Sequence, residues 1–158
     1  MTVELPKTPS FRLDGRRALV TGAGRGLGLA AAAALAEAGA HVTLAARTTK
    51  EIEEAADAIL KRGQRADALT LDVRDVEVTR AAIAKQDPFE ILFNNAGTNK
   101  PAPFVDVKVE DFDFVFSLNV RAAYFVAQAV ARRLVEAKRP GSIINMSSQM
   151  GHVGGPTR

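Results

Sequence analysis

Short apolar runs alternate with amphipathic stretches along most of this chain. Five runs predict strands because they are rich in Val, Leu, Ile and Ala and end at glycine or polar residues. These strands are expected at residues 17–21, 41–46, 66–71, 90–94 and 142–147. The segments between them have the spacing of helices, and strands that alternate with helices predict a parallel sheet with right-handed crossovers. The pattern therefore predicts an α/β fold.

Helix start and stop signals agree with these strand positions. The helix expected at residues 26–38 ends before Gly39. The next begins at Thr48-Thr49-Lys50-Glu51, which predicts a capping box, and ends before Gly63. Apolar residues at helical spacing from residue 111 to residue 137 predict one long helix. The stretch from Asp72 to Asn94 leaves room for only a short crossover helix.

Composition narrows the class of protein. With 158 residues, 47% of them apolar, the chain can bury one core, and residues 1–158 are expected to form a single domain. The 21 Lys and Arg residues are interspersed with 18 Asp and Glu residues, so nucleic-acid binding is not expected. The chain has no cysteine and only His41 and His152, so neither thiolate chemistry nor a metal site is expected.

No targeting or membrane segment is expected from the sequence. Residues 1–14 contain prolines and charges of both signs without the apolar core of a secretory signal. No apolar run is expected to approach the roughly 20 residues that span a bilayer. These observations predict a soluble cytoplasmic protein without a membrane partner.

A glycine-rich segment, T-G-A-G-R-G-L-G, directly follows the first expected strand. A strand that ends in glycines and opens into a helix presents backbone N–H groups and the positive end of a helix dipole to a pyrophosphate. Dinucleotide binding is therefore predicted for this segment. The alternative is that the glycines only permit positive backbone angles and tight helix packing. The predicted binding residues are Thr21, Gly22, Gly24, Arg25, Gly26, Leu27 and Gly28.

Four further motifs accompany the expected strands. They are Leu71-Asp72-Val73 after the third strand, Asn94-Asn95-Ala96-Gly97 at the end of the fourth, Asn119 in the long helix, and Ser147-Ser148 after the fifth strand. Together with the glycine loop, they make residues 14–156 resemble the classical short-chain dehydrogenase/reductase family. The resemblance implies a doubly wound parallel sheet of Rossmann type, in three α/β/α layers and incomplete at its carboxyl-terminal end. It also implies an oxidoreductase that uses NAD or NADP to interconvert a secondary alcohol and a ketone.

The resemblance assigns further cofactor contacts residue by residue. Asp72 and Val73, after the third strand, stand where the family contacts adenine. A solvated loop carboxylate is the alternative for Asp72. Asn95, Ala96 and Gly97 would pass beside the riboses, and Asn94 would hold neighbouring strands together.

The resemblance also assigns two catalytic residues. The downstream glycine places Ser148, rather than the adjacent Ser147, in the catalytic position. Its hydroxyl would donate a hydrogen bond to the oxygen of the reacting carbonyl. Asn119 would hold a water in a proton relay. The alternative is a buried asparagine whose side chain is satisfied by backbone groups.

The end of the second strand bears on the choice of cofactor. Ala46 stands where an acidic residue would bind a ribose 2′-hydroxyl, and Arg47 follows it. Arg25, in the glycine loop, supplies a second cation. Two arginines without an acid favour NADP over NAD, and solvated surface arginines are the alternative.

The family's remaining catalytic pair, Tyr-x-x-x-Lys, is expected just beyond Arg158. Tyr124 is followed at the fourth place by Gln128, so it cannot supply the pair and is expected to be a packing residue. An amino-terminal part of a longer enzyme is favoured, and a naturally short, non-catalytic dinucleotide-binding protein is the alternative. By resemblance alone, the helix at residues 111–137 predicts a homo-oligomer, a dimer or tetramer, and the expected partner is a small carbonyl or alcohol substrate.

Overall fold

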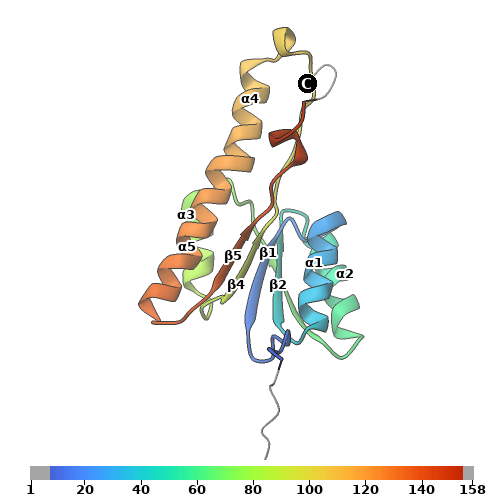
Figure 1. The fold of residues 1–158 in the computed structure, drawn as a ribbon, viewed down its shortest axis with the longest axis vertical. Coiled ribbons are helices and arrows are strands. Elements are labelled where there is room, and N and C mark those ends of the chain that lie inside the picture. Colours follow the sequence, from blue (N-terminus) through green and yellow to red (C-terminus); the bar gives the residue numbers. More distant parts are fainter. Residues whose placement is uncertain (1–7, 155–158) are drawn as a thin grey trace, which may run out of the picture.

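The computed structural model describes residues 8–154, which form an open five-stranded sheet in the order β3-β2-β1-β4-β5 (Figure 1). All neighbouring strands are parallel. The chain moves outward from β1 to β3 and then returns to the other side of β1 for β4. This reversal creates a crevice at the carboxyl ends of β1 and β4, where sheets of this kind bind ligands. The strands are β1 (Arg17–Thr21), β2 (His41–Ala46), β3 (Arg65–Thr70), β4 (Ile91–Asn94) and β5 (Ser142–Asn145).

Helices cover both faces of the sheet. Figure 1 shows α1 (Gly26–Glu37) and α2 (Thr49–Leu60) on one face, with α3 (Val76–Ala84) and α5 (Ala123–Glu136) on the other. The predicted three-layer α/β/α architecture is therefore confirmed. Every predicted strand is present, and no boundary differs by more than two residues.

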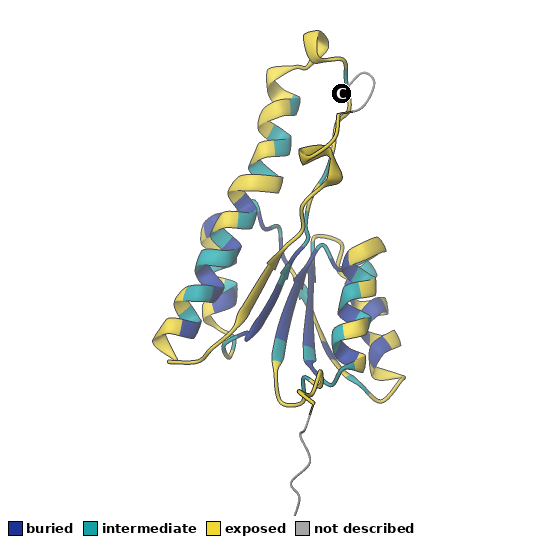
Figure 2. Cartoon of the chain, in the orientation of Figure 1, coloured by how far each residue is buried: buried dark blue, intermediate teal, exposed yellow. Residues whose placement is uncertain are grey.

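The core lies on the central strands (Figure 2). Val20 and Val42 face α1 and α2 and pack against Ile52, all of them fully buried. Leu19 and Leu92 belong to the cluster on the opposite face, which α5 covers. By contrast, all four residues of β5 are exposed, so this edge strand adds hydrogen bonds to the sheet but little buried area.

The long helix predicted at residues 111–137 extends from Val109 to Glu136. It consists of α4 (Val109–Phe116), a wider π-helical segment (Ser117–Ala122) and α5. This helix is long and apolar enough to cross a membrane by length and composition, so the expectation that no run approaches that length is wrong. Its α5 half nevertheless packs on the sheet as a core helix, with Val126 and Val130 fully buried.

The start of α2 differs from the prediction. Thr48 is the residue that precedes the helix, but its side chain makes no capping hydrogen bond, so the predicted capping box is not formed. Instead, the Thr49 hydroxyl lies 2.8 Å from the Thr70 hydroxyl at the end of β3. The expected short crossover helix is confirmed as α3, which has 9 residues and is capped by the Asp75 carboxylate.

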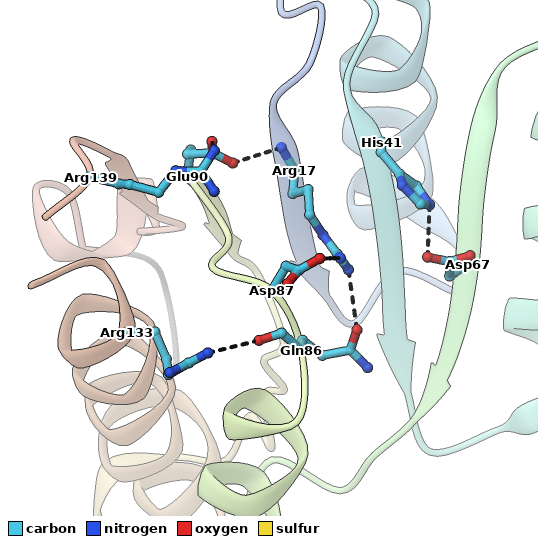
Figure 3. A network of polar contacts seen from close by, with 8 residues as sticks. All are labelled: Arg17, His41, Asp67, Gln86, Asp87, Glu90, Arg133 and Arg139. Atoms are coloured by element: carbon cyan, nitrogen blue, oxygen red, sulfur yellow. Dashed lines mark hydrogen bonds and ion pairs between the residues drawn. The ribbon is translucent and has the colours of Figure 1, made fainter. Parts of the chain in front are cut away.

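A polar network ties the elements together at the opposite end of the sheet from the glycine loop (Figure 3). The Glu90 carboxylate, 2% exposed, accepts a hydrogen bond from the Arg17 backbone N–H at 2.9 Å and pairs with Arg139. The Arg17 guanidinium donates to Gln86 and Asp87. This network joins β1, the segment before β4 and the loop before β5.

Candidate functional site

A cavity of about 400 Å³ lies at the carboxyl ends of the parallel strands. Its wall is built by the loops that follow β1, β2, β3 and β4, together with the first turn of α2. Thr21 and Gly26 lie outside this wall. The predicted binding residues that line it are Gly22, Gly24, Arg25, Leu27, Gly28, Arg47, Asp72, Val73, Asn95, Ala96 and Gly97.

The glycines of the loop serve different purposes. A Cβ on Gly28 would lie 2.2 Å from the carbonyl oxygen of Gly22, so the backbone leaves no room for a side chain there. Gly22 has a φ of +63°, which favours glycine. Gly24 differs from both, because a Cβ there would meet only the Glu51 side chain. A close backbone contact therefore accounts for Gly28 and a positive φ for Gly22, while Gly24 makes room for the Glu51 side chain.

Thr21 holds two loops of the site together. Its hydroxyl is fully buried and accepts hydrogen bonds from the backbone N–H groups of Asn95 and Ala96, each at 3.0 Å. It also donates to the Asn94 side chain at 3.4 Å. Thr21 thus positions the loop after β4 rather than facing the cavity.

The two asparagines after β4 are anchored by their side chains. The Asn94 amide donates to the carbonyl of Ala123 at 2.7 Å and to the Asn145 side chain at 3.1 Å, which joins β4 to α5 and β5. The expectation that Asn94 holds neighbouring strands is therefore confirmed. The Asn95 amide donates to the backbone carbonyls of Thr21 and Gly22, so the loops after β1 and β4 form one surface.

Asp72 is not an isolated loop carboxylate. The Arg74 guanidinium donates to both of its oxygens, the shortest contact being 2.6 Å. Hydrogen bonding to Arg74 lowers the pKa of Asp72 below its usual value, and the positive charge of Arg47 lowers that pKa further. Asp72 is therefore an ionised group at neutral pH with its charge largely compensated.

A second cavity, of about 770 Å³, adjoins the first and brings the predicted catalytic residues together. Asn119, Ser147 and Ser148 line it, as do the shared residues Leu27 and Asn95.

Tyr124 also lines this second cavity, and the residue is 63% exposed. The prediction that Tyr124 is a packing residue is therefore wrong. Among the aromatic rings, Tyr124 contacts the edge of Phe125, with the two ring centroids 5.2 Å apart.

The Asn119 side chain is used by the backbone of the loop after β4. Its Oδ1 accepts from the N–H of Thr98 at 2.9 Å, and its Nδ2 donates to the Thr98 carbonyl at 2.8 Å. Asn119 lies in the π-helical segment, a distortion that is frequent at functional sites. The alternative of a side chain satisfied by backbone groups describes this contact, although the residue is exposed rather than buried.

Ser148 and Ser147 both face the second cavity. Ser148 precedes a short 3₁₀ turn, and its Oγ accepts a hydrogen bond from the Met150 N–H at 3.2 Å. That contact leaves its hydroxyl proton free to donate toward the cavity. The chain end at residues 155–158, including Pro156 of the predicted resemblance, lies outside the described residues.

Sequence reasoning missed Glu51 at this site. Glu51 lines the first cavity, and its Oε2 would lie 2.8 Å from a Cβ on Gly24. The predicted capping box gave Glu51 a local role, which concealed its position across the glycine loop. Among residues 8–154, no group of three His, Asp or Glu side chains is arranged to hold a metal ion.

The comparisons with known proteins agree with this geometry. The model of the short chain dehydrogenase family matches residues 16–158, so this chain belongs to that family. It is 42% identical to D-erythrulose reductase of Gallus gallus over 141 residues, which are 89% of this chain and 56% of that protein. It is 40% identical to L-xylulose reductase of Bos taurus over 144 residues, or 91% of this chain and 57% of that protein.

A solved structure shows the same fold. Gluconate 5-dehydrogenase from Burkholderia cenocepacia J2315, in complex with NADP and tartrate, has a TM-score of 0.87 and 39% sequence identity. The match covers 94% of this chain and 59% of that one. The chain thus spans a little over half the length of the relatives it matches.

Proposed function

We propose that this protein is an oxidoreductase that interconverts a secondary alcohol and a ketone by hydride transfer with a nicotinamide dinucleotide. One observation carries the proposal: the cavity at the glycine loop adjoins a second cavity that holds Ser148 and Asn119. A dinucleotide and a small carbonyl compound would therefore lie side by side. The family relationship and the names of the relatives support the same reaction class.

The residues present fit a phosphate-containing cofactor. The helix α1 begins at Gly26, so its first N–H groups face the loop without intrahelical acceptors. Gly22, Gly24 and Arg25 of the glycine loop line the first cavity, and Arg25 adds a positive charge. When bound, the nicotinamide ring would supply or accept the hydride at its C4 atom.

The residues of the second cavity would act on the carbonyl group. The Ser148 hydroxyl would donate a hydrogen bond to the carbonyl oxygen and stabilise the negative charge that develops on it. Asn119 would fix the loop after β4 through Thr98. Oδ1 and Nδ2 of Asn119 each make one hydrogen bond to Thr98. A relay water would therefore bind to the hydrogen-bonding capacity that Asn119 has left.

NADP is the proposed cofactor in preference to NAD. Arg25 and Arg47 both line the first cavity and are both exposed. No ion pair among the described residues involves either of them. Two available guanidinium groups suit a 2′-phosphate because arginine binds phosphate oxygens in a bidentate manner.

A homo-oligomer in the cytoplasm is the proposed state of the protein. Phe112 and Phe116 stack with their ring centroids 4.2 Å apart, and they are 50% and 48% exposed. An apolar face of this kind on a long helix supports contact with a second copy. Light scattering coupled to size-exclusion chromatography tests the oligomeric state, and a monomer at all protein concentrations would contradict the proposed homo-oligomer.

Direct binding tests the proposed function. We would measure the intact mass of the purified protein and titrate it with NADPH and NADH, following nucleotide fluorescence. We expect NADPH to bind more tightly, and Arg47→Ala to weaken NADPH more than NADH. Arg132→Ala, which changes an exposed arginine of α5, is the matched control. Failure of both nucleotides to bind would overturn the proposal.

Activity tests the reaction class. Oxidation of NADPH by the whole natural protein would be followed at 340 nm with erythrulose, xylulose and 5-ketogluconate, the ketones suggested by the names of the relatives. We expect turnover with at least one ketone and a large loss in Ser148→Ala. Binding without turnover of any ketone would contradict the proposed reaction, as would a Ser148→Ala variant of undiminished activity.

A further inference from the structure

Four charged side chains line the first cavity: Arg25, Arg47, Glu51 and Asp72. The Asp72 carboxylate is compensated by Arg74, whose guanidinium contacts both of its oxygens. None of the ion pairs within residues 8–154 involves Glu51. Glu51 is therefore a carboxylate without a direct counter-ion, in a cavity that also holds two available arginines.

The structure places Glu51 beside the glycine loop on an anchored backbone. Its Cβ and Oε2 would lie 3.0 and 2.8 Å from a Cβ on Gly24, so the side chain lies across the glycine loop. The next residue, Ile52, is fully buried in the core and anchors the backbone. The contact between the Thr49 and Thr70 hydroxyls holds the start of α2 against β3. The side chain cannot leave the cavity wall without a change of rotamer against this fixed backbone.

A carboxylate beside the ribose 2′ position would discriminate between the two nicotinamide cofactors. It accepts a hydrogen bond from a ribose hydroxyl, and it repels a phosphate dianion. The strand β2 ends in Ala46, so the chain has no acid at the end of that strand. The first turn of α2 supplies a carboxylate to the same cavity instead.

We propose that Glu51 is a selectivity residue that restrains binding of the 2′-phosphorylated cofactor against the attraction of Arg25 and Arg47. The site then accepts both NADPH and NADH, and its preference for NADPH is smaller than the two arginines alone would give. This inference rests on the proposed function, because it requires that the cavity binds a nicotinamide dinucleotide.

Binding measurements on Glu51→Gln test the inference. The dissociation constants of NADPH and NADH would be measured by fluorescence, and those of adenosine 2′,5′-bisphosphate and AMP by competition. In Glu51→Gln, we expect the ratio of the NADH to the NADPH dissociation constant to rise about tenfold, which is a stronger preference for NADPH. This is the scale of one charge–charge contact in a partly solvated site. The bisphosphate to AMP preference should rise in parallel, which shows that the effect acts at the 2′-phosphate.

Two variants control for charge and for structure. Glu53→Gln removes the same charge from an exposed position of α2 that does not line the cavity, and it should leave both ratios unchanged. Glu51→Asp keeps the charge and should keep the wild-type ratio within about threefold. Raising the salt concentration from 50 to 500 mM should narrow the difference between Glu51→Gln and the wild type, since screening weakens charge repulsion.

The outcomes separate this inference from the proposed function. If the wild type binds neither nucleotide, the proposed function fails and the inference fails with it. If the wild type binds both nucleotides, and the ratio of the NADH to the NADPH dissociation constant is the same in Glu51→Gln as in Glu53→Gln, only the inference is overturned. A thermal melt of each variant shows whether it is folded. If Glu51→Gln is not folded, the salt dependence of the wild type and the ratio measured for Glu51→Asp still test the inference.

Discussion

A single hydroxyl group organises the backbone of two loops at the site. The Thr21 Oγ accepts hydrogen bonds from the N–H groups of Asn95 and Ala96 in a fully buried position. These residues were predicted as cofactor contacts from their motifs alone. The structure adds that the glycine loop and the loop after β4 depend on each other through this one side chain.

Replacing Thr21 by valine keeps the shape and removes the hydroxyl. Two partly buried N–H groups then lose their acceptor, and each unsatisfied buried group costs about 1–3 kcal/mol. We expect Thr21→Val to lower the free energy of unfolding by about 2 kcal/mol or more, as measured by urea denaturation. Thr43→Val is the matched control, because the Thr43 Oγ is buried in β2 without a partner among the described residues. Equal losses in the two variants would contradict the role given to Thr21.

The contact between Asp72 and Arg74 predicts a pH effect of defined sign. Hydrogen bonding to Arg74 lowers the pKa of Asp72 below the ordinary value of 3.8. The pair therefore contributes stability above pH 3.8, and that contribution is lost as the pH falls through the lowered pKa. Because the two side chains are 35% and 33% exposed, the contribution at neutral pH is at most about 1 kcal/mol.

The pKa of Asp72 can be followed directly. In Arg74→Gln, the carboxyl ¹³C titration of Asp72 should move to higher pH, toward the ordinary value. In Arg80→Gln, which breaks an exposed pair with Glu77 on α3, the Asp72 titration should stay where it is. An Asp72 pKa that is the same in the wild type and in Arg74→Gln would contradict the assigned cause.

At the scale of elements, the sequence predicted most of the fold because its signals are local. The strands between Arg17 and Asn94 follow from apolar runs that end at glycine or polar residues. The glycine loop was predicted to bind a cofactor because it directly follows a strand, whereas the resemblance implied the same role for the Asn95-Ala96-Gly97 run. Both segments line the first cavity.

The features that the sequence did not predict depend on contacts between distant segments or on the conformation of a side chain. Glu51 reaches the cavity because α2 starts behind the glycine loop, which no local pattern reveals. Arg74 compensates Asp72 through its side-chain conformation. Tyr124, near the start of α5, is exposed and lines the second cavity. Periodicity predicts a helix but not how far its neighbours extend.

The network around Glu90 joins three elements, and its removal should lower the stability of the whole sheet. Glu90 is 2% exposed and accepts from the Arg17 N–H while pairing with Arg139, which is 42% exposed. We expect Glu90→Ala to lower the free energy of unfolding by about 2–3 kcal/mol, because it leaves a buried N–H without an acceptor and an arginine without its partner.

The adjacent Asp87 provides the matched control. It pairs with the same Arg17 guanidinium at 3.3 Å, but its side chain is 81% exposed (Figure 3). We expect Asp87→Ala to change the free energy of unfolding by less than about 0.5 kcal/mol, as is usual for exposed ion pairs. Chemical denaturation of both variants checks this, and a small loss for Glu90→Ala would show that the network does not contribute to stability.

At the scale of the whole molecule, the carboxyl ends and the amino ends of the strands have different roles. The carboxyl ends of the strands carry both cavities, exposed arginines and the glycine loop. The amino ends carry the Glu90 network, which links elements and lines neither cavity. Substitutions that change ligand binding and substitutions that change stability should therefore separate along the strand direction.

Burial is also uneven across the sheet, from β1, almost wholly buried, to β5, whose four residues are all exposed. Local opening of β5 therefore exposes little new apolar surface and costs less free energy than opening of β1. In a polypeptide of residues 1–158, we expect the amides of β5 to exchange with solvent deuterium at least about tenfold faster than those of β1 and β2. Peptide-resolved mass spectrometry measures the difference.

The same exchange experiment reports on the environment of β5 in solution. The strand is bonded to β4 on one side only, so within the described residues its other edge has no strand beside it. If β5 of this polypeptide exchanges as slowly as β1, we expect a second copy to cover its exposed face and edge. Repeating the measurement over a range of protein concentrations tests this, because protection by a second copy is lost on dilution.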